Sequence, residues 1–529
     1  MKKYPNLLWI IVLLLGWIFD FLFWDKSVGV NFAIFISISL IGGFFLLIAN
    51  HKKPALKSLL LIAPLVFFGC MTFSRQEPLT LFLAYTFALF SIGVFAVTYL
   101  GGRWTQYSLL DYFNKFFQLI GSLFSRPASF FGEIRKEHAE LGVTKKKLPA
   151  GPIVRGLLIA LPIVACFTAL LASADLVFSQ KLADFFVNFT FEKTTENIFR
   201  LIIILFWAYA LAGTFLHASS RSQDEKLLGE EKPVVKPFIG FTESAIVLGS
   251  VTILFLLFVI VQFRYFFGGN ANIGLEGYTY SQYARRGFNE LVAVAFLSLV
   301  MILGFSTATR RENMFQRRIY SGLSIAIVAL VMIILVSAYQ RINLAIDWHG
   351  FSRLRLYPQI FLVWVGIVFV TVVILEIVHL ERYFAFAAVL ACIGFAVSLS
   401  LFNVDDAIVR HNVLRASQGK NFNVSYLATL SIDAVPALAV SFSDLSLPTQ
   451  VHEGIGAALL CHYHSNIIWE TSNDDWRSFN LSLWNAQRFY DSVKAQLKNY
   501  SVMVDDNAIP IRVRTPGKIS YECTDSAPN

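Results

Sequence analysis

Three short stretches of the chain concentrate arginines beside acidic residues, and each stretch adjoins a long apolar segment. They are Tyr280–Leu291, Arg341–Tyr357 and Asn403–Arg415. A guanidinium group binds phosphate or carboxylate through two parallel hydrogen bonds, so clustered arginines are typical of anion sites. If the three stretches meet, the sequence predicts an anion-binding site that comprises Arg285, Arg286, Glu290, Arg341, Arg353, Arg355 and Arg410.

The same arginines allow a purely structural interpretation. They could pair with Glu290, Asp405 and Asp406 and so hold a soluble domain against the membrane. Some could instead extend their charged ends to the aqueous boundary, as long basic side chains do near lipid. The sequence leaves the ligand site and the structural pairs open as alternatives.

Signatures of known catalytic machinery are not found along the sequence. It contains no Gly-x-Ser-x-Gly elbow, no phosphate-binding Walker loop and no His-Glu-x-x-His zinc motif. We therefore predict no catalytic residues and no cofactor. An enzymatic activity stays open but is not favoured.

The C-terminal part carries a group of histidines and two cysteines. His462 and His464 would share one face of a strand, as zinc ligands can, but no further ligand stands at suitable spacing, so no metal site is predicted. Cys461 and Cys523 could form a disulfide in an oxidising compartment, and free thiols are the alternative.

Ionisable residues within the apolar segments lie near segment ends. Glu376 and His379, three residues apart, could pair on one helix face. A proton-driven transporter usually needs a carboxylate deep in the membrane, so this distribution weighs against that class.

The composition defines the elements that must position these residues. Of 529 residues, 56% are hydrophobic and 15% are charged, whereas a soluble protein carries about 25% charged residues. Soluble cores stop growing at about 250–300 residues, so lipid must cover much of the apolar surface. The net charge of +9 comes from basic loops between apolar segments and does not indicate nucleic-acid binding.

Eleven apolar segments are long enough to cross a hydrocarbon layer of roughly 30 Å as helices. We predict an all-α integral membrane bundle of about eleven transmembrane helices in residues 1–402, followed by a small, mainly α soluble domain in residues 403–529. The predicted spans are 7–24, 28–49, 55–73, 79–100, 153–172, 197–217, 242–265, 288–306, 319–338, 357–379 and 382–402.

Lys and Arg are distributed unevenly between alternate loops. The set that includes the N-terminus carries 22 of them and the other set carries 9. Cytoplasmic loops are enriched in Lys and Arg, so we expect the N-terminus in the cytoplasm. An odd number of spans then leaves the C-terminal domain outside, and an error of one span would reverse that side.

Three segments are expected to lie along the membrane surface. The first is 104–141, within a cytoplasmic segment at about 101–152 that mixes aromatic and basic residues in an amphipathic pattern. The other two are 176–191 and 339–356.

The soluble part follows ordinary periodicities. Asp405–Ser417 and Asn423–Leu430 predict helices, and Trp476–Asn499 predicts a long amphipathic helix. Ser501–Val513 predicts a short hairpin.

Three stretches, Tyr280–Leu291, Gly350–Tyr357 and Asn403–Arg415, together with Ser431–Leu438, resemble a known family. It is a bacterial membrane-protein family catalogued as domain of unknown function 4173, related to domain of unknown function 4153. The resemblance covers roughly residues 150–500. It implies a multi-pass protein of the bacterial cytoplasmic (inner) membrane and implies no particular activity.

Taken together, these features favour a scaffold or sensor that recognises an anionic envelope or lipid component at the outer interface. A membrane transporter, or an enzyme acting on a lipid-linked phosphate, is the alternative. The expected partners are membrane lipids, including an anionic headgroup or envelope precursor, and not nucleic acid. The sequence does not define the oligomeric state.

Overall fold

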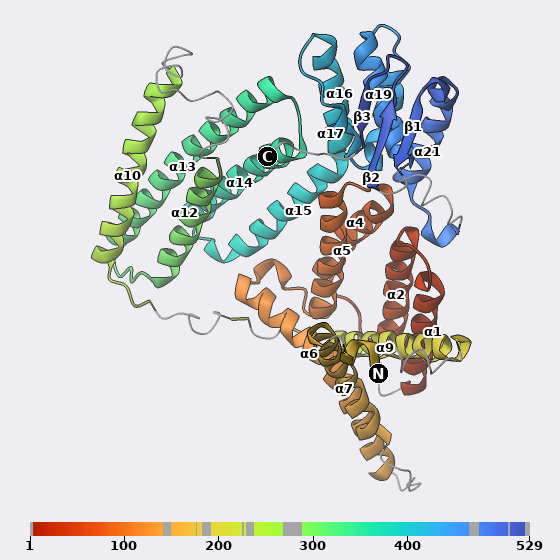
Figure 1. The fold of residues 1–529 in the computed structure, drawn as a ribbon. Coiled ribbons are helices and arrows are strands. Elements are labelled where there is room, and N and C mark those ends of the chain that lie inside the picture. The colour runs from red at the N-terminus through yellow and green to blue at the C-terminus, as the bar shows by residue number, and fades with distance from the viewer. Residues whose placement is uncertain are drawn as a thin grey trace.

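The computed structural model describes residues 4–140, 150–175, 177–181, 192–224, 227–228, 237–267, 288–464, 475–505 and 508–523. Within these residues the protein is almost entirely helical, and its strands lie only near the C-terminus (Figure 1).

Ten helices in the described residues are long and apolar enough to cross a membrane, which confirms the predicted all-α bundle. A helix satisfies its backbone hydrogen bonds internally, as a segment in lipid must. The ten are α1 (Pro5–Phe23), α2 (Val30–Ala49), α3 (Leu56–Leu59) with α4 (Ile62–Ser74), α5 (Pro78–Thr98), α9 (Glu192–Ser220), α10 (Phe241–Phe267), α12 (Phe288–Ala308), α13 (Met314–His349), α14 (Arg353–Val378) and α15 (Phe384–Phe402).

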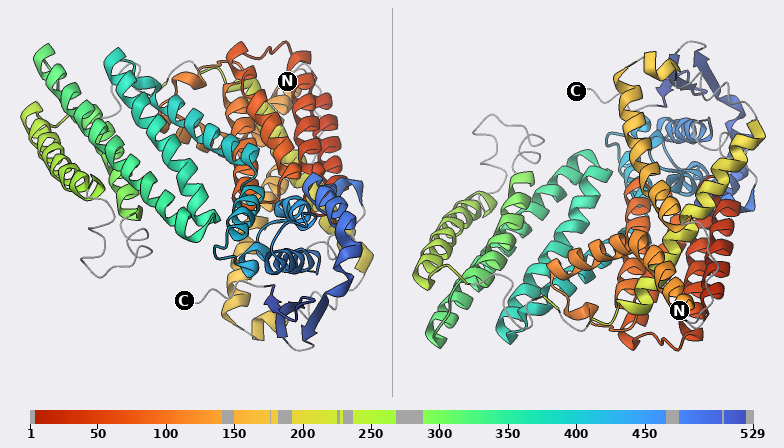
Figure 2. Two further views of the ribbon diagram at one scale, coloured as in Figure 1. Left: turned by 90° about the horizontal axis from the view of Figure 1, so that it is seen from above. Right: turned by 90° about the horizontal axis from the view of Figure 1, so that it is seen from below.

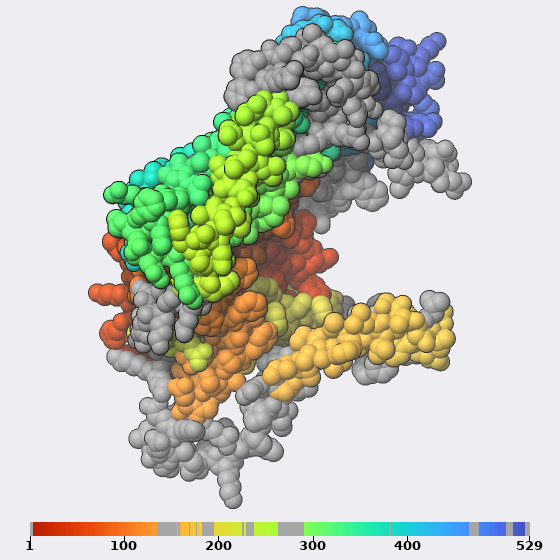
Figure 3. All heavy atoms as spheres, turned by 90° about the vertical axis from the view of Figure 1, so that its left-hand side faces the viewer, coloured from red at the N-terminus to blue at the C-terminus, as the bar shows by residue number. Residues whose placement is uncertain are grey.

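The remaining predicted span, 153–172, falls within α7 (Ala150–Ala174). Its apolar part is the shorter helix Ile159–Ala174, whose described side chains are nearly all exposed. Figure 3 shows this helix standing away from the other helices. At 1.5 Å per residue its 25 residues rise about 37 Å, which is enough to cross a bilayer.

The C-terminal domain contacts one end of the bundle, here called the domain end. The α1–α2 link lies there, because Val30 N donates to Phe479 O at 2.9 Å. The α4–α5 link lies there too, since Gln76 N donates to Asp433 Oδ2 at 2.8 Å. Figure 2 shows the domain in blue against the red and orange N-terminal helices, with the green helices α10, α12 and α13 to one side.

The opposite end of the bundle, here called the loop end, gathers the other links. The ends of α5 and α9 meet there, since Gly101 N donates to Ser222 O at 2.8 Å. The end of α12 meets the start of α10, since Phe238 N donates to Ala308 O at 3.0 Å. The helices therefore alternate in direction between the two ends, except across the stretch that contains α7.

Helix α6 (Leu109–Glu140) has the amphipathic character predicted for 104–141. One face packs on α5 and α9 through buried Tyr112, Leu119 and Phe130. The other face leaves several aromatic and aliphatic side chains exposed at helical spacing, which suits contact with a lipid surface. They are Leu110, Phe113, Phe117, Ile120 and Phe124.

The prediction of a surface segment at 339–356 is wrong. Helix α13 continues to His349 and α14 begins at Arg353, so only three residues link them. The helix ends at Gly350, whose φ of +79° is a conformation that favours glycine. Of the surface segment predicted at 176–191, only residues 177–181 lie within the described residues, and they are helical.

The C-terminal domain combines short helices with a small antiparallel sheet. The sheet has the order β1 (Ser501–Asp505), β2 (Ala508–Arg514) and β3 (Ser520–Glu522), with Val502 opposite Val513. The helices are α16 (Val404–Ser417), α17 (Val424–Ala428), α18 (Val435–Phe442), α19 (Thr449–His462) and α21 (Leu481–Val493).

The single long helix predicted at 476–499 is interrupted. A 3-10 turn at Trp476–Ser478 precedes α21, and a second at Lys494–Asn499 follows it. The interruption arises at Asn480, whose side chain accepts from Leu483 N and so caps the start of α21.

The core of the C-terminal domain extends into the membrane-type helices. Leu356 of α14 and Leu399 of α15 belong to the same buried cluster as the domain's own Leu438 and Ile455. Leu79 of α5 packs against this cluster. The domain is therefore built onto the domain end of the bundle through shared apolar burial.

Candidate functional site

A bidentate ion pair lies at the junction between the bundle and the C-terminal domain. Arg353, the first residue of α14, donates to Asp405 through Nε at 2.8 Å and through Nη2 at 2.5 Å. Asp405, in the first turn of α16, is fully buried and also accepts from the Ser431 amide at 2.7 Å and from its hydroxyl at 2.6 Å. Three donor groups, the guanidinium of Arg353 and the amide and hydroxyl of Ser431, thus satisfy the carboxylate, as a buried charge requires.

Two further buried acids extend this junction to the α4–α5 link. Glu77 caps α5 by accepting from Leu79 N and Thr80 N, and it also accepts from the Tyr357 hydroxyl of α14. Asp433 accepts from the amides of Gln76 and Glu77 at 2.8 and 2.9 Å. The C-terminal domain is therefore attached to α5 and α14 by charge-assisted hydrogen bonds as well as by apolar contact.

Burial shifts the pKa values of Asp433 and His462 in the C-terminal domain. Desolvation raises the pKa of Asp433, although hydrogen bonds from Ser482 and from the Gln76 amide act in the other direction. Desolvation lowers the pKa of His462, whose Nε2 lies 3.0 Å from the Leu427 carbonyl. His462 is therefore a neutral core residue at neutral pH.

The remaining predicted site residues occupy different positions around the junction. Arg410 pairs with Asp406 at 2.6 Å on the exposed face of α16. Arg341, buried in α13, donates to Gln262 Oε1 at 3.1 Å. Glu290 is exposed in the first turn of α12, and Arg285 and Arg286 lie outside the described residues.

Arg355 and Arg415 bind backbone carbonyls around the end of α13. Arg355 donates to Gly350 O at 3.0 Å. Arg415 donates to Ile346 O and Trp348 O, each at 2.9 Å. A helix end leaves carbonyls without partners in the helix, so Arg415 acts as a cap that joins α16 to α13.

The arginines in the described part of the junction thus differ in their contacts. Arg353 and Arg410 pair with Asp405 and Asp406, as the pairing interpretation anticipated, and Arg415 binds backbone carbonyls instead. Arg341 of α13 faces Gln262 of α10, whereas Arg355 lies in the first turn of α14, a helix that forms one side of a groove with α13.

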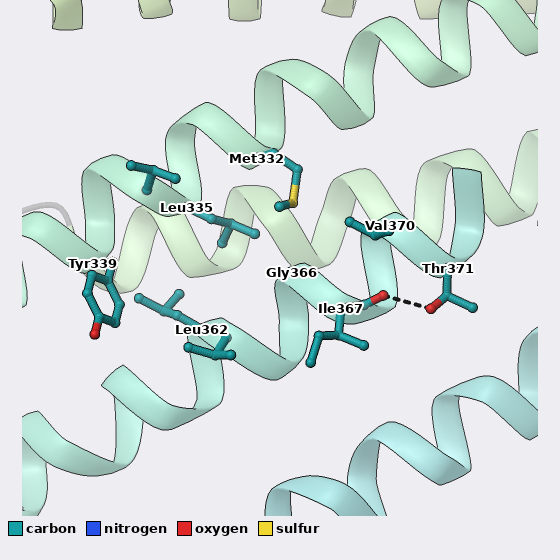
Figure 4. Close-up of a pocket in the computed structure, with 10 residues that line it drawn as sticks. Met332, Leu335, Tyr339, Leu362, Gly366, Ile367, Val370 and Thr371 are labelled. Atoms are coloured by element: carbon teal, nitrogen blue, oxygen red, sulfur yellow. Dashed lines mark hydrogen bonds between the residues drawn. The ribbon is translucent and has the colours of Figure 1, made fainter. Parts of the chain in front are cut away.

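That groove has a volume of about 480 Å³ and an almost wholly apolar lining (Figure 4). Side chains of α13 form one wall, and side chains of α14 form the other, which includes Gly366. The lining residues are Met332, Leu335, Val336, Tyr339, Leu362, Val363, Gly366, Ile367, Val370 and Thr371.

A second pocket, of about 360 Å³, continues the groove toward the domain end and shares Tyr339 and Val363 with it. Gln359 lines this pocket and donates to the Tyr339 hydroxyl at 3.1 Å and to Asn343 Oδ1 at 2.9 Å. Arg355 precedes Gln359 by four residues, so the two side chains lie on one face of α14.

Glu376, near the other end of α14, pairs differently from the sequence prediction. Its carboxylate lies 3.6 Å from Arg311 and accepts from the Ser321 hydroxyl at 2.7 Å. His379 instead adopts a left-handed conformation at the end of α14, with a φ of +58°. The buried acid therefore links α14 to the start of α13 at the loop end.

Cys461 and Cys523 are joined by a disulfide that ties the end of α19 to the end of the sheet. His462 and His464 do not share a strand, because the chain is helical there. Within the described residues, no group of three or more His, Cys, Asp or Glu side chains is arranged to hold a metal ion.

Two acids of the junction, Glu77 and Asp433, were not among the residues singled out from the sequence. Glu77 precedes Pro78, and an acid before a proline is a helix-start signal that could have identified the cap. No local signal pairs Asp433 with residues 76 and 77, because 356 positions separate it from Glu77.

Comparison with known families gives one match. A family model described as "Domain of unknown function (DUF4153)" matches residues 62–440, a range that contains the acids and arginines of the junction and both pockets. No curated protein and no solved structure matches the chain.

Proposed function

The chain belongs to the DUF4153 family, and we propose that it is a multi-pass membrane scaffold or sensor that recognises an anionic lipid or envelope component at the outer interface. The site comprises the arginines beside the domain end, with Arg355 at its centre. The other proposed members are Arg285, Arg286, Glu290 and Arg341, of which Arg285 and Arg286 lie outside the described residues.

One observation supports the site most directly. Gln359, Tyr339 and Asn343 form a hydrogen-bonded polar layer next to an apolar groove that opens between two membrane-type helices. Arg355 lies one helical turn from Gln359 on the same face of α14. Arginine is the residue best suited to hold a phosphate at such a boundary, because its donors match two phosphate oxygens at once. Arg353 has a different role in this account, since it holds Asp405.

The proposed location is the cytoplasmic membrane of a bacterium, with the N-terminus in the cytoplasm and the C-terminal domain outside. The loops of the loop end carry most of the Lys and Arg between spans, as cytoplasmic loops do. The Cys461–Cys523 disulfide in the C-terminal domain fits an oxidising exterior. The resemblance of Tyr280–Leu291 and Asn403–Arg415 to the related 4173 group supports the bacterial assignment.

The directions of the helices support eleven crossings. Helix α5 finishes at the loop end, where Gly101 N donates to Ser222 O. Helix α9 starts at the domain end, because its Arg200 pairs with Asp20 near the end of α1 at 2.6 Å. The chain must therefore cross between them, and α7 is the apolar helix in that stretch. Ten spans plus α7 give the odd number that separates the two termini.

Native mass spectrometry in the presence of phosphatidylglycerol or phosphatidylcholine tests the function. The wild type should retain phosphatidylglycerol, and Arg355→Gln and Arg285→Gln should each lower its retention. Arg318→Gln, an exposed position near the start of α13 at the loop end, is the matched control and should not change retention. Equal retention of the anionic and the zwitterionic lipid, or no effect of either arginine variant, would refute the proposal.

A further inference from the structure

We propose that the groove between α13 and α14 holds one acyl chain of an anionic glycerophospholipid from the outer leaflet, with the lipid phosphate at Arg355. This inference rests on the proposed function and names its ligand. The occupant is a membrane lipid and not a soluble anion, because most of the site is apolar.

The groove suits a hydrocarbon chain in both chemistry and position. Its walls consist of aliphatic side chains from Leu335 and Val336 on α13 and from Leu362, Ile367 and Val370 on α14. Several of these side chains are exposed, so the groove opens sideways where lipid would surround the bundle. A lipid tail can therefore enter from the bilayer without passing through water.

The order of chemical groups along the groove matches the order along a glycerophospholipid. The aliphatic lining begins near Thr371 and continues to Val363. The hydroxyl of Tyr339 and the amides of Gln359 and Asn343 come next, at the level that suits glycerol esters. Arg355 follows one helical turn further toward the domain end, where a phosphate would lie.

The length of the groove agrees with this assignment. Leu356, which lines the second pocket, and Thr371, at the far end of the groove, are 15 residues apart on α14. At 1.5 Å per residue they are separated by about 22 Å along the helix. One leaflet contributes about 15 Å of hydrocarbon, so the groove accommodates a full acyl chain and the ester region above it.

Gly366 keeps the groove open at its middle. A Cβ atom built at Gly366 would lie 3.5 Å from Met332 Cε, which is ordinary contact, so a small addition is tolerated. A leucine there would extend into the space that the acyl chain is proposed to occupy. Gly304 of α12 has nothing within 4 Å of such a Cβ and provides a matched control.

The test compares two phosphatidylglycerols with the same headgroup, one with 16-carbon chains and one with 6-carbon chains. Native mass spectrometry measures the retention of each by the full-length protein. We expect Gly366→Leu to lower retention of the long-chain lipid about tenfold and to leave the short-chain lipid unchanged. Arg355→Gln should lower retention of both, and Gly304→Leu should change neither.

A second pair of variants tests the groove independently, in case Gly366→Leu impairs folding. Val336→Trp fills the groove from an exposed position on α13, and Ile333→Trp places the same bulk at an exposed position of α13 outside the groove lining. Only Val336→Trp should weaken retention of the long-chain lipid. Thermal unfolding in detergent should be the same for both.

The outcomes separate the inference from the proposed function. If neither groove variant changes long-chain retention while Arg355→Gln lowers it, the acyl-chain assignment is wrong and anion recognition stands. If Arg355→Gln and Arg285→Gln also leave retention unchanged, the proposed function itself is wrong. Retention of phosphatidylcholine in the groove as strong as that of phosphatidylglycerol would overturn the anionic character of the ligand.

Discussion

Replacement of Asp405 by asparagine should loosen the C-terminal domain from the membrane helices far more than the same replacement at its neighbour, Asp406. Both acids lie in the first turn of α16, so both variants lose the same favourable interaction with the helix N-terminus. They differ in their partners. Asp405 is buried against Arg353 of α14, whereas Asp406 pairs with Arg410 four residues along its own exposed helix face.

The expected magnitudes follow from burial. Removing one partner of a buried pair costs about 3–5 kcal/mol. The Arg353 side chain keeps 23% of its exposure, so water offsets part of the loss and about 3 kcal/mol is expected. The Arg410 side chain keeps 62% of its exposure, and an exposed pair within one helix contributes about 0.3–0.5 kcal/mol.

Amide hydrogen exchange of peptides within residues 404–442 measures the difference. A loss of about 3 kcal/mol raises the population of the locally opened state about 150-fold, since each 1.4 kcal/mol is a factor of ten. Asp405→Asn should therefore accelerate exchange by about two orders of magnitude, and Asp406→Asn by about twofold. Equal acceleration in the two variants would refute the assignment of Arg353–Asp405 as the main attachment.

Three further outcomes are expected. Asp433→Asn should be mild, because asparagine can still accept from the Gln76 and Glu77 amides and contact Ser482. Burial raises the pKa of Asp433, so protonation of this acid stabilises the wild type at low pH, and that stabilisation is lost as the pH rises above about 4. The unfolding temperature of the variant relative to the wild type should therefore increase from pH 4 to pH 7. A difference that stays constant over this range would contradict the prediction. Cys461→Ser should destabilise the C-terminal domain by about 4 kcal/mol, because the disulfide joins residues 62 positions apart and so restricts the unfolded chain. Cys70→Ser, which removes a free thiol, should not destabilise it. Thermal unfolding with and without reductant measures both effects. Gly394→Ala should destabilise the bundle by about 1–3 kcal/mol, because the added Cβ would lie 2.0 Å from the Trp364 ring. Gly304→Ala, which meets no neighbour, should not destabilise it. Equal unfolding temperatures for the two variants would contradict the close packing of α14 on α15.

Features set by local chemistry could be predicted from the sequence. The apolar segments identified ten helices of the bundle, because a long apolar helix is the form that satisfies its backbone in lipid. The hairpin predicted at Ser501–Val513 corresponds to the β1–β2 pair. The end of α13 could have been placed better, since Gly350 follows an uninterrupted helical stretch and is the first strong helix-ending signal in it.

The roles of the individual arginines could not be predicted, because they depend on long-range packing. Arg353 and Arg355 are two residues apart on α14 and therefore point in different directions. The sequence shows this separation but does not show which of the two faces Asp405, 52 residues away from Arg353. The groove is likewise invisible in the sequence, since it depends on how α13 and α14 lie side by side.

The most direct test of the account determines on which sides of the membrane the two termini lie. Reporters that are active on only one side of the membrane would be fused before Met1 and after Asn529 of the full chain. Eleven crossings, with α7 among them, predict a cytoplasmic N-terminus and a C-terminal domain on the far side. Both termini reporting from the cytoplasm would contradict the account, because the C-terminal domain, the disulfide and the proposed lipid site would then face the wrong compartment.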